Sequence, residues 1–340
     1  AAGVRLALLT GRDKGEARAG RLADLAAGRI DILVGTHALI QDTVEFFDLG
    51  LVIIDEQHRF GVEQRDSLRT KGKNHTTPHL LVMTATPIPR TIAMTFFGDL
   101  NHSTLNELPG GRRPIKSYVV PEYLPKYTTR AYEVMREHIH QGHQIYIVCP
   151  RINGPGGVLE THQHLSETEF KNYRIGLLHG QLKDADKDTT MRQFANGDLD
   201  ILIATTVIEV GVDVPNAALM VIEHAERMGL AQLHQLRGRV GRGAAESVCV
   251  LLFAEPLSEL AKARLKVIYE HTDGFEIARQ DLNIRGPGEF LGARQSGVPM
   301  LRFANLEEDL HLLEQAREIA PMLIEQNPEI VEAHLARWLA

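Results

Sequence analysis

Cysteine is nearly absent from this chain, whose 340 residues include only Cys149 and Cys249. Both stand in apolar runs typical of strands, so we expect two buried free thiols rather than a disulfide. Long apolar runs are missing too, because stretches such as residues 145–149 and 251–254 fall far short of the roughly 20 residues that a membrane helix needs. Since no signal peptide or membrane anchor is visible either, we expect a cytoplasmic protein without a membrane partner.

An excess of basic residues is also missing. The chain carries 37 Lys and Arg against 44 Asp and Glu, which gives a net charge of -7 and a pI near 6.2. Domains that bind nucleic acid usually carry a basic excess, so the bulk charge does not point to one. A few cations along one groove would still suffice on an acidic protein. The 16 His residues show no metal-ligand spacing with Cys, Asp or Glu, so we expect no zinc site.

Strand and helix patterns alternate through the first part of the chain. Apolar runs predict strands at residues 5–9, 30–34, 51–54 and 79–83, and a helix at residues 15–27. Strands separated by helices are typical of a parallel α/β sheet. The stretch 106–114, rich in Pro and Gly, then predicts a hinge loop.

A second alternation predicts a second α/β domain. Its strands are predicted at residues 115–120, 144–148, 174–178, 200–204, 219–222 and 248–253. The strand signals stop after Pro256, and helical patterns follow at residues 259–271, 275–283, 306–326 and 328–340. We therefore expect three parts, residues 1–108, 109–256 and 257–340, in line with the size at which one core stops growing.

Two acidic residues, Asp55 and Glu56, directly follow the predicted strand at residues 51–54. Open α/β sheets bind ligands at the carboxyl ends of their strands, where a nucleotide would sit. In phosphoryl transfer the first carboxylate of such a pair holds Mg²⁺ and the second takes a proton from the attacking water. Thr84 and Thr86 follow the next strand, where hydroxyl groups can hydrogen-bond those acids. By themselves the two motifs are equally compatible with a solvated strand end and an ordinary turn.

The second domain contributes hydroxyl groups and arginines. Thr205 and Thr206 follow a predicted strand, and Gly211 permits a close backbone approach beside Asp213. Three arginines, interleaved with glycines, then stand at Arg237, Arg239 and Arg242. They are compatible with an ordinary basic helix end. Alternatively they act as arginine fingers, planar cations that stabilise charge on a transferring phosphoryl group.

In this order, the motifs resemble those of superfamily 2 helicases and translocases. Residues 55–58 (Asp-Glu-Gln-His) resemble the second motif of that superfamily, 84–86 (Thr-Ala-Thr) the third, 204–215 the fifth and 235–242 the sixth. Residues 55–62, 84–91 and 281–297 (Asp-Leu-Asn-Ile-Arg-Gly-Pro-Gly-Glu-Phe-Leu-Gly-Ala-Arg-Gln-Ser-Gly) resemble the RecG family of branched-DNA translocases more narrowly. The resemblance implies two RecA-like parallel-sheet motor domains, then a helical hairpin and a helical tail.

The resemblance also implies roles for single residues. Asp55 would hold Mg²⁺ through water, Glu56 would orient or deprotonate the attacking water, and Arg239 and Arg242 would reach the phosphates of ATP bound between the two motor domains. The nucleotide would be bound by Asp55, Gln235, Gly211 and Asp213. Contact with DNA, or its coupling to ATP turnover, is implied for Thr36, His37, Thr84, Thr86, Thr205, Thr206, Arg285 and Gln295. For Thr36 and His37, a helix N-cap explains the local pattern equally well.

The partners implied are branched double-stranded DNA, namely replication forks and Holliday junctions, and single-stranded DNA-binding protein, with the chain as a bacterial monomer that joins the nucleoid on DNA. No G-x-x-x-x-G-K-[ST] sequence occurs, so the loop that cradles phosphates is missing and the first motor domain looks truncated. We therefore expect no useful ATP hydrolysis from this polypeptide alone. Two alternatives stay open: a non-catalytic module that binds DNA or a partner, and the motor of a transcription-repair coupling factor.

Overall fold

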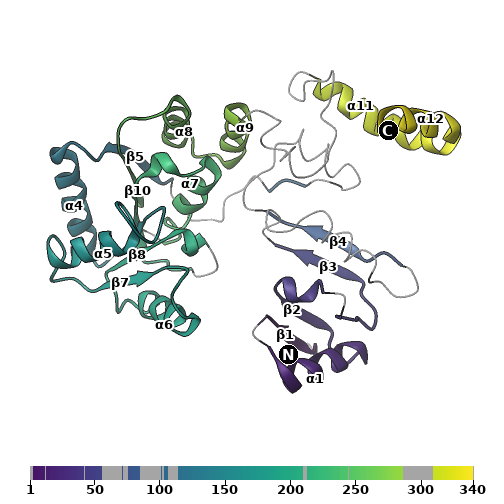
Figure 1. The fold of residues 1–340 in the computed structure, drawn as a ribbon, viewed down its shortest axis with the longest axis horizontal. Coiled ribbons are helices and arrows are strands. Elements are labelled where there is room, and N and C mark those ends of the chain that lie inside the picture. Colours follow the sequence, from purple (N-terminus) through teal and green to yellow (C-terminus); the bar gives the residue numbers. More distant parts are fainter. Residues whose placement is uncertain are drawn as a thin grey trace. The chain divides into compact units, whose positions relative to one another are not determined.

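The chain divides into two compact units, residues 1–85 and 86–340, in the computed structural model (Figure 1). The structure describes residues 3–11, 13–41, 43–55, 71, 76–84, 101, 103–105, 114–209, 213–243, 245–285 and 309–339. Most of the predicted hinge at residues 106–114 lies outside these ranges, and the three-part division at residues 108 and 256 stays a prediction.

The first unit contains two pairs of parallel strands. Strand β1 (Leu6–Leu9) pairs with β2 (Ile32–Gly35), and β3 (Leu51–Ile54) pairs with β4 (His79–Val82). Helix α1 (Gly15–Ala26) connects the first pair, and a short 3-10 helix, η1 (His37–Leu39), follows β2. The alternation of strands and helix predicted from the sequence is confirmed here.

The second unit is built on a six-stranded, fully parallel sheet in the order β5-β10-β9-β6-β8-β7. Its strands are β5 (Lys116–Pro121), β6 (Gln144–Val148), β7 (Ile175–Leu178), β8 (Ile201–Ala204), β9 (Ala217–Ile222) and β10 (Val248–Phe253). The central strands are buried on both faces, as parallel sheets between helix layers require. All six were predicted from apolar runs.

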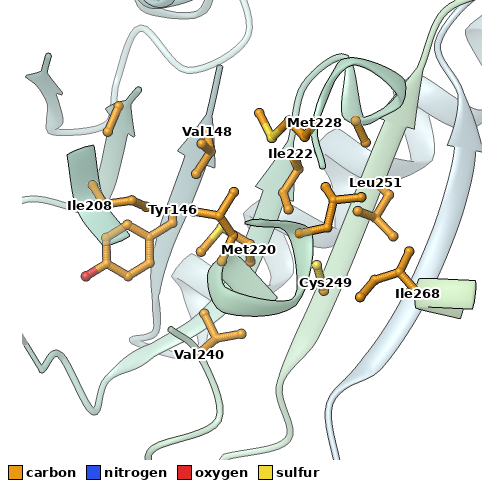
Figure 2. Close-up of a cluster of buried hydrophobic side chains, with 14 of the residues drawn as sticks. Tyr146, Val148, Ile208, Met220, Ile222, Met228, Val240, Cys249, Leu251 and Ile268 are labelled. Atoms are coloured by element: carbon orange, nitrogen blue, oxygen red, sulfur yellow. The ribbon is translucent and has the colours of Figure 1, made fainter. Parts of the chain in front are cut away.

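Alternate residues of these strands enter two separate cores. Tyr146, Met220 and Cys249 face one core, which helices α6 (Asp184–Ala195), α7 (Leu230–Arg237), α8 (Glu259–Glu270) and α9 (Gly274–Arg285) cover. Figure 2 shows part of this cluster. Ile145 and Ile147 face the other core, under α4 (Pro125–His140) and α5 (Val158–Glu167). Each fully buried Ile or Leu stabilises the fold by roughly 1.5–3 kcal/mol, so the two layers fix the carboxyl edge of the sheet rigidly.

The cysteines and the carboxyl-terminal helices agree with the sequence predictions. Cys149 and Cys249 are buried free thiols, and burial raises the pKa of each to about 12. Helices α11 (Leu310–Gln326) and α12 (Pro328–Leu339) pack against each other. Within the described parts of the chain, no helix combines the length and apolar character needed to cross a membrane. The fold is therefore two parallel α/β units with a mostly helical carboxyl-terminal region.

Candidate functional site

Asp55 and Thr84 lie at one edge of the first unit. Asp55 directly follows β3 and is exposed, while Thr84 stands two residues beyond β4 and is half-buried. The strands are parallel, with Ile54 opposite Val82, and the Met83 N–H donates to the Ile54 carbonyl oxygen at 2.8 Å. The two chain segments therefore leave the sheet together, and the structure brings Asp55 and Thr84 to the same carboxyl edge, as predicted.

Thr36 directly follows β2 and is exposed. Its carbonyl oxygen accepts a hydrogen bond from the Leu39 N–H at 3.0 Å, which closes the 3-10 turn η1. This is a backbone contact, so the side chain of Thr36 gains no role from it. The assignment of Thr36 to DNA contact stays a prediction.

Helix α7 positions the arginine segment of the second unit. Leu230, Leu233 and Leu236 are fully buried at helical spacing, which fixes one face of α7 against the core of the sheet. The helix ends at Arg237, and Gly238 is its C-cap. Residues 239–242 therefore follow directly after a helix that is packed against the core.

Arg237 is a structural residue, which corrects its grouping with the two candidate arginine fingers. Its side chain is 3% exposed. Its Nη1 donates to the carbonyl oxygens of Ile268 and His271, both at 2.8 Å, and so caps the end of α8. Burial lowers the pKa of Arg237 from its usual value. Because its guanidinium group is buried and hydrogen-bonded to backbone carbonyl oxygens, Arg237 cannot reach a phosphate.

Arg242 is brought against Asp213 by the loop after α7. Gly241 has a φ of +80°, which turns the chain, and an added Cβ at Gly243 would lie 2.3 Å from the carbonyl oxygen of Pro215. This close backbone approach holds the loop beside the segment that carries Asp213. Arg242 Nη1 lies 3.3 Å from Asp213 Oδ1, while its Nε is buried and has no hydrogen-bond partner among the residues that the structure describes.

Arg239 and Gln235 are half-buried on the same segment. Burial raises the pKa of Tyr146 to about 12, while the charges of Arg239 and Arg242 lower it and that of Asp213 raises it. The two arginines and Asp213 therefore lie within electrostatic range of one hydroxyl group. The charges of Arg239, Arg242 and Asp213 thus all act on the pKa of Tyr146, a residue that the sequence did not indicate.

Thr205 and Thr206 follow β8 at the carboxyl edge of the six-stranded sheet. Thr205 is 7% exposed, and its N–H donates to the carbonyl oxygen of Leu178 at 3.1 Å. Thr206 begins the 3-10 helix η4 (Thr206–Glu209) and is half-buried. Of the two hydroxyl residues, Thr206 is therefore the more accessible to a ligand.

A cluster of carboxyl groups at the same edge was missed by the sequence reasoning. Glu122 follows β5, and Glu223 and Glu226 follow β9. Burial raises the pKa of Glu223 to about 8, and the charges of Glu122 and Glu226 add to this effect. His224 Nδ1 lies 3.3 Å from Glu226 Oε1 and 3.7 Å from Glu122 Oε2. No sequence signal could have found this cluster, because Glu122 stands about a hundred residues before Glu223, His224 and Glu226.

Several predicted site residues lie outside the described residues. They are Glu56, Thr86, Gly211 and Gln295, together with the side chains of His37 and Arg285. Their assigned roles stay predictions.

Comparison with known proteins identifies three families along the chain. Residues 1–95 match the DEAD/DEAH box helicase family, and residues 127–244 match the helicase conserved C-terminal domain. Residues 271–337 match the family described as ATP-dependent DNA helicase RecG, domain 3, C-terminal. The matches follow the two units and the helical region in order.

Individual relatives are similar in sequence to almost the whole chain. The ATP-dependent DNA helicase RecG of Synechocystis sp. is 51% identical over 332 residues, covering 96% of this chain and 39% of that protein. The RecG of Haemophilus influenzae is 49% identical over 346 residues, covering 99% of this chain and 49% of that protein. The chain belongs to the RecG family. It thus spans half or less of the length of these RecG relatives.

A solved structure supports the same family. "Structure of RecG bound to three-way DNA junction" matches with a TM-score of 0.67 and 45% identity, covering 92% of this chain and 40% of that chain. The match of residues 271–337 to a RecG family model, together with the RecG relatives, disfavours the transcription-repair coupling factor and the non-catalytic module.

Proposed function

We propose that this chain forms the motor part of an ATP-dependent DNA translocase that acts on branched DNA, in fork reversal and Holliday junction branch migration during recombination and repair. The observation that carries the proposal is the pair Arg239 and Arg242, which are half-buried after helix α7, together with the buried Nε of Arg242, for which no group among the described residues is a hydrogen-bond partner. The RecG relatives, which are named ATP-dependent DNA helicases, support it.

The residues present fit ATP and Mg²⁺. Asp55 offers an exposed carboxylate at a strand end, and hard cations such as Mg²⁺ prefer oxygen ligands. The unsatisfied Nε of Arg242 fits a phosphate oxygen, since buried polar groups require a partner. When bound, ATP supplies the phosphoryl group and Mg²⁺ neutralises part of its charge.

The proposed mechanism assigns one task to each group. Asp55 would hold Mg²⁺ through water, and Glu56 would take a proton from the water that attacks the phosphoryl group. Arg239 and Arg242 would stabilise the negative charge that develops in the transition state, while Gln235, Gly211 and Asp213 would hold the nucleotide. Thr205, Thr206 and Thr84, together with Arg285 and Gln295, relay the change to DNA.

The test is replacement of Arg239 or Arg242 by Ala in the full-length gene product that contains this chain, because the 340 residues themselves lack a phosphate-binding loop. Each variant should lose DNA-stimulated ATPase by about 10³- to 10⁵-fold and keep its affinity for a three-way junction. Arg192→Ala, an exposed arginine on α6, is the matched control. Near-normal ATP turnover in the Arg239 or Arg242 variant would remove that residue from the mechanism.

We propose further that the intact protein is a bacterial cytoplasmic monomer that joins the nucleoid on DNA and also binds single-stranded DNA-binding protein. Fluorescence anisotropy with a three-way junction and a linear duplex of equal length tests the DNA preference. Sedimentation velocity with and without single-stranded DNA-binding protein tests the oligomeric state and that contact. Equal affinity for both DNAs would contradict the proposed preference.

A further inference from the structure

Strand β5 is an edge of the six-stranded sheet and leaves part of its backbone open. The Lys116 N–H donates to the Ser247 carbonyl oxygen at 3.1 Å, and the Glu122 N–H donates to that of Phe253 at 2.9 Å. Backbone groups alternate in direction along a strand, so Ser117 and Val119 direct their N–H and C=O groups away from β10. Within the part of the chain that the structure describes, no strand pairs with this side of β5.

A groove of about 1050 Å³ follows this open edge. Helix α4 lines one side and helix α8 the other (Figure 1). Three exposed aromatic rings line it: Tyr118 at 50%, Tyr127 at 46% and Tyr269 at 59% exposure. Tyrosine gives large contact area at low entropic cost, which is why it is frequent in peptide-binding surfaces. A strand edge between two apolar walls is the geometry used for strand addition.

The groove is more basic than the rest of the chain. Its lining includes four cations and two carboxylates, although the whole chain has a net charge of -7. The cations are Lys116, Arg130, Lys262 and Lys266, and their ion pairs with neighbouring carboxylates are solvent-exposed. Exposed ion pairs are worth about 0–1 kcal/mol, so an incoming carboxylate can replace these partners at little cost.

We propose that this groove binds an extended acidic peptide segment of another protein, which adds to β5 as a seventh strand. The peptide backbone pairs with Ser117 and Val119, and its alternate apolar side chains contact Tyr118 and Tyr127 on the α4 side of the groove. Its carboxylates face Lys262 and Lys266 on α8. Pro121 has no N–H to offer, so the pairing ends before it. The inference does not depend on the ATPase mechanism.

The probe is a fluorescein-labelled peptide of nine residues in which Glu and Asp alternate with Val and Ile, titrated with the 340-residue chain. We expect saturable binding with a Kd of about 10–100 µM. Methylation of the backbone nitrogens at alternate positions should weaken binding ~10-fold or more, because it removes the ladder donors. Replacing the acids by Lys should weaken it similarly. Equal affinity for the methylated peptide would overturn strand addition.

Variants of the groove distinguish specific binding in the groove from non-specific binding elsewhere on the surface. Tyr118→Ala combined with Tyr127→Ala should weaken binding ~10-fold. Tyr123→Ala is the matched control, since Tyr123 is 52% exposed but lies outside the groove lining. Equal losses in both variants would overturn the assignment of the site.

Hydrogen exchange locates the contact residue by residue. At saturating peptide the amides of Ser117 and Val119 should exchange ~10-fold more slowly, while those of Tyr118 and Val120, directed towards β10, should change little. Slowing at Tyr118 and Val120 alone would overturn the proposed pairing. A second outcome would also overturn the proposal. If exchange at Ser117 and Val119 slows without peptide as the chain concentration rises, and sedimentation shows a dimer, the occupant of the groove is a second copy of the chain.

Discussion

Arg237 and Arg239 stand two positions apart and have opposite environments. Arg237 is 3% exposed and caps α8, whereas Arg239 is half-buried after the end of α7. A motif that interleaves arginines with glycines gives both residues the same sequence context. For Arg237 the environment comes from the end of α8, where the Ile268 and His271 carbonyl oxygens accept hydrogen bonds from its guanidinium group.

Replacing Arg237 by Leu should therefore lower stability rather than disturb chemistry alone. The carbonyl oxygens of Ile268 and His271 lose a charged donor, which we expect to cost about 2–4 kcal/mol in free energy of unfolding. Urea denaturation followed by circular dichroism measures this. Arg239→Leu should cost less than about 1 kcal/mol. A loss as small in the Arg237 variant would show that the buried contacts do not support α8.

Glu223 predicts a pH dependence of stability. Its pKa is raised from 4.5 to about 8 by burial and by the charges of Glu122 and Glu226. Between these two pH values the folded chain keeps a proton that the unfolded chain has released, so the free energy of unfolding falls as pH rises. Urea denaturation at intervals from pH 5 to pH 8 should show this decline. Glu223→Gln should remove the part of the decline that Glu223 causes.

The difference between the parent chain and the Gln variant isolates Glu223 from other titrating groups. Burial lowers the pKa of His234 to about 4, and the charge of Arg237 adds to this. The folded His234 therefore stays neutral where the unfolded one is protonated, so its share of stability rises with pH up to about 6.5. Parallel curves for the two chains across pH 5 to 8 would contradict the role of Glu223.

At the scale of elements, the sequence located the strands well. Asp200 and Thr205 bound an apolar run at β8, and the observed strand Ile201–Ala204 lies inside it. Strand β9 begins at Ala217, two residues before the predicted start, because Ala carries little strand signal although Ala217 and Ala218 are buried in the sheet. Local pattern therefore predicts where strands occur.

Contacts between distant segments could not be predicted in this way. The strand order that puts β5 at an edge depends on pairing with β10, more than a hundred residues later. The family resemblance assigned Asp213 and Arg242 to one nucleotide site, but the contact between them was not predicted. Periodicity reports the faces of one element, whereas these contacts depend on which elements meet.

Gly243 tests how the loop after α7, which carries Arg239 and Arg242, is positioned. Its missing Cβ allows the loop to lie against Pro215, where an added Cβ would be 2.3 Å from the carbonyl oxygen. Gly243→Ala should force the loop away, lower stability by about 1–3 kcal/mol, and reduce DNA-stimulated ATPase of the full-length gene product. Gly20→Ala in α1, with open space around it, is the control and should be neutral or stabilising. An unchanged ATPase in the Gly243 variant would contradict this account.

At the scale of the whole molecule, the two units differ in how well they cover their sheets. The central strands of the second unit are buried on both faces. In the first unit, alternate residues of all four strands remain 48–68% exposed, namely Leu6, Leu8, Ile32, Val34, Leu51, Ile53 and Leu81. Because about half of each such side chain is exposed, it forgoes roughly half of the 1.5–3 kcal/mol that full burial would contribute. The first unit therefore has less apolar burial to stabilise its fold.

We therefore expect the two units to behave differently when expressed separately. Residues 114–285 contain both cores of the six-stranded sheet and should unfold in one cooperative transition on heating. Residues 1–85 should show no cooperative transition and should bind the dye ANS, because their apolar sheet face is open to solvent. Ile53→Ser in this fragment should reduce dye binding. Circular dichroism measures the transition, and ANS fluorescence measures dye binding. A sharp transition without dye binding in residues 1–85 would mean that the exposed face does not limit the stability of the first unit.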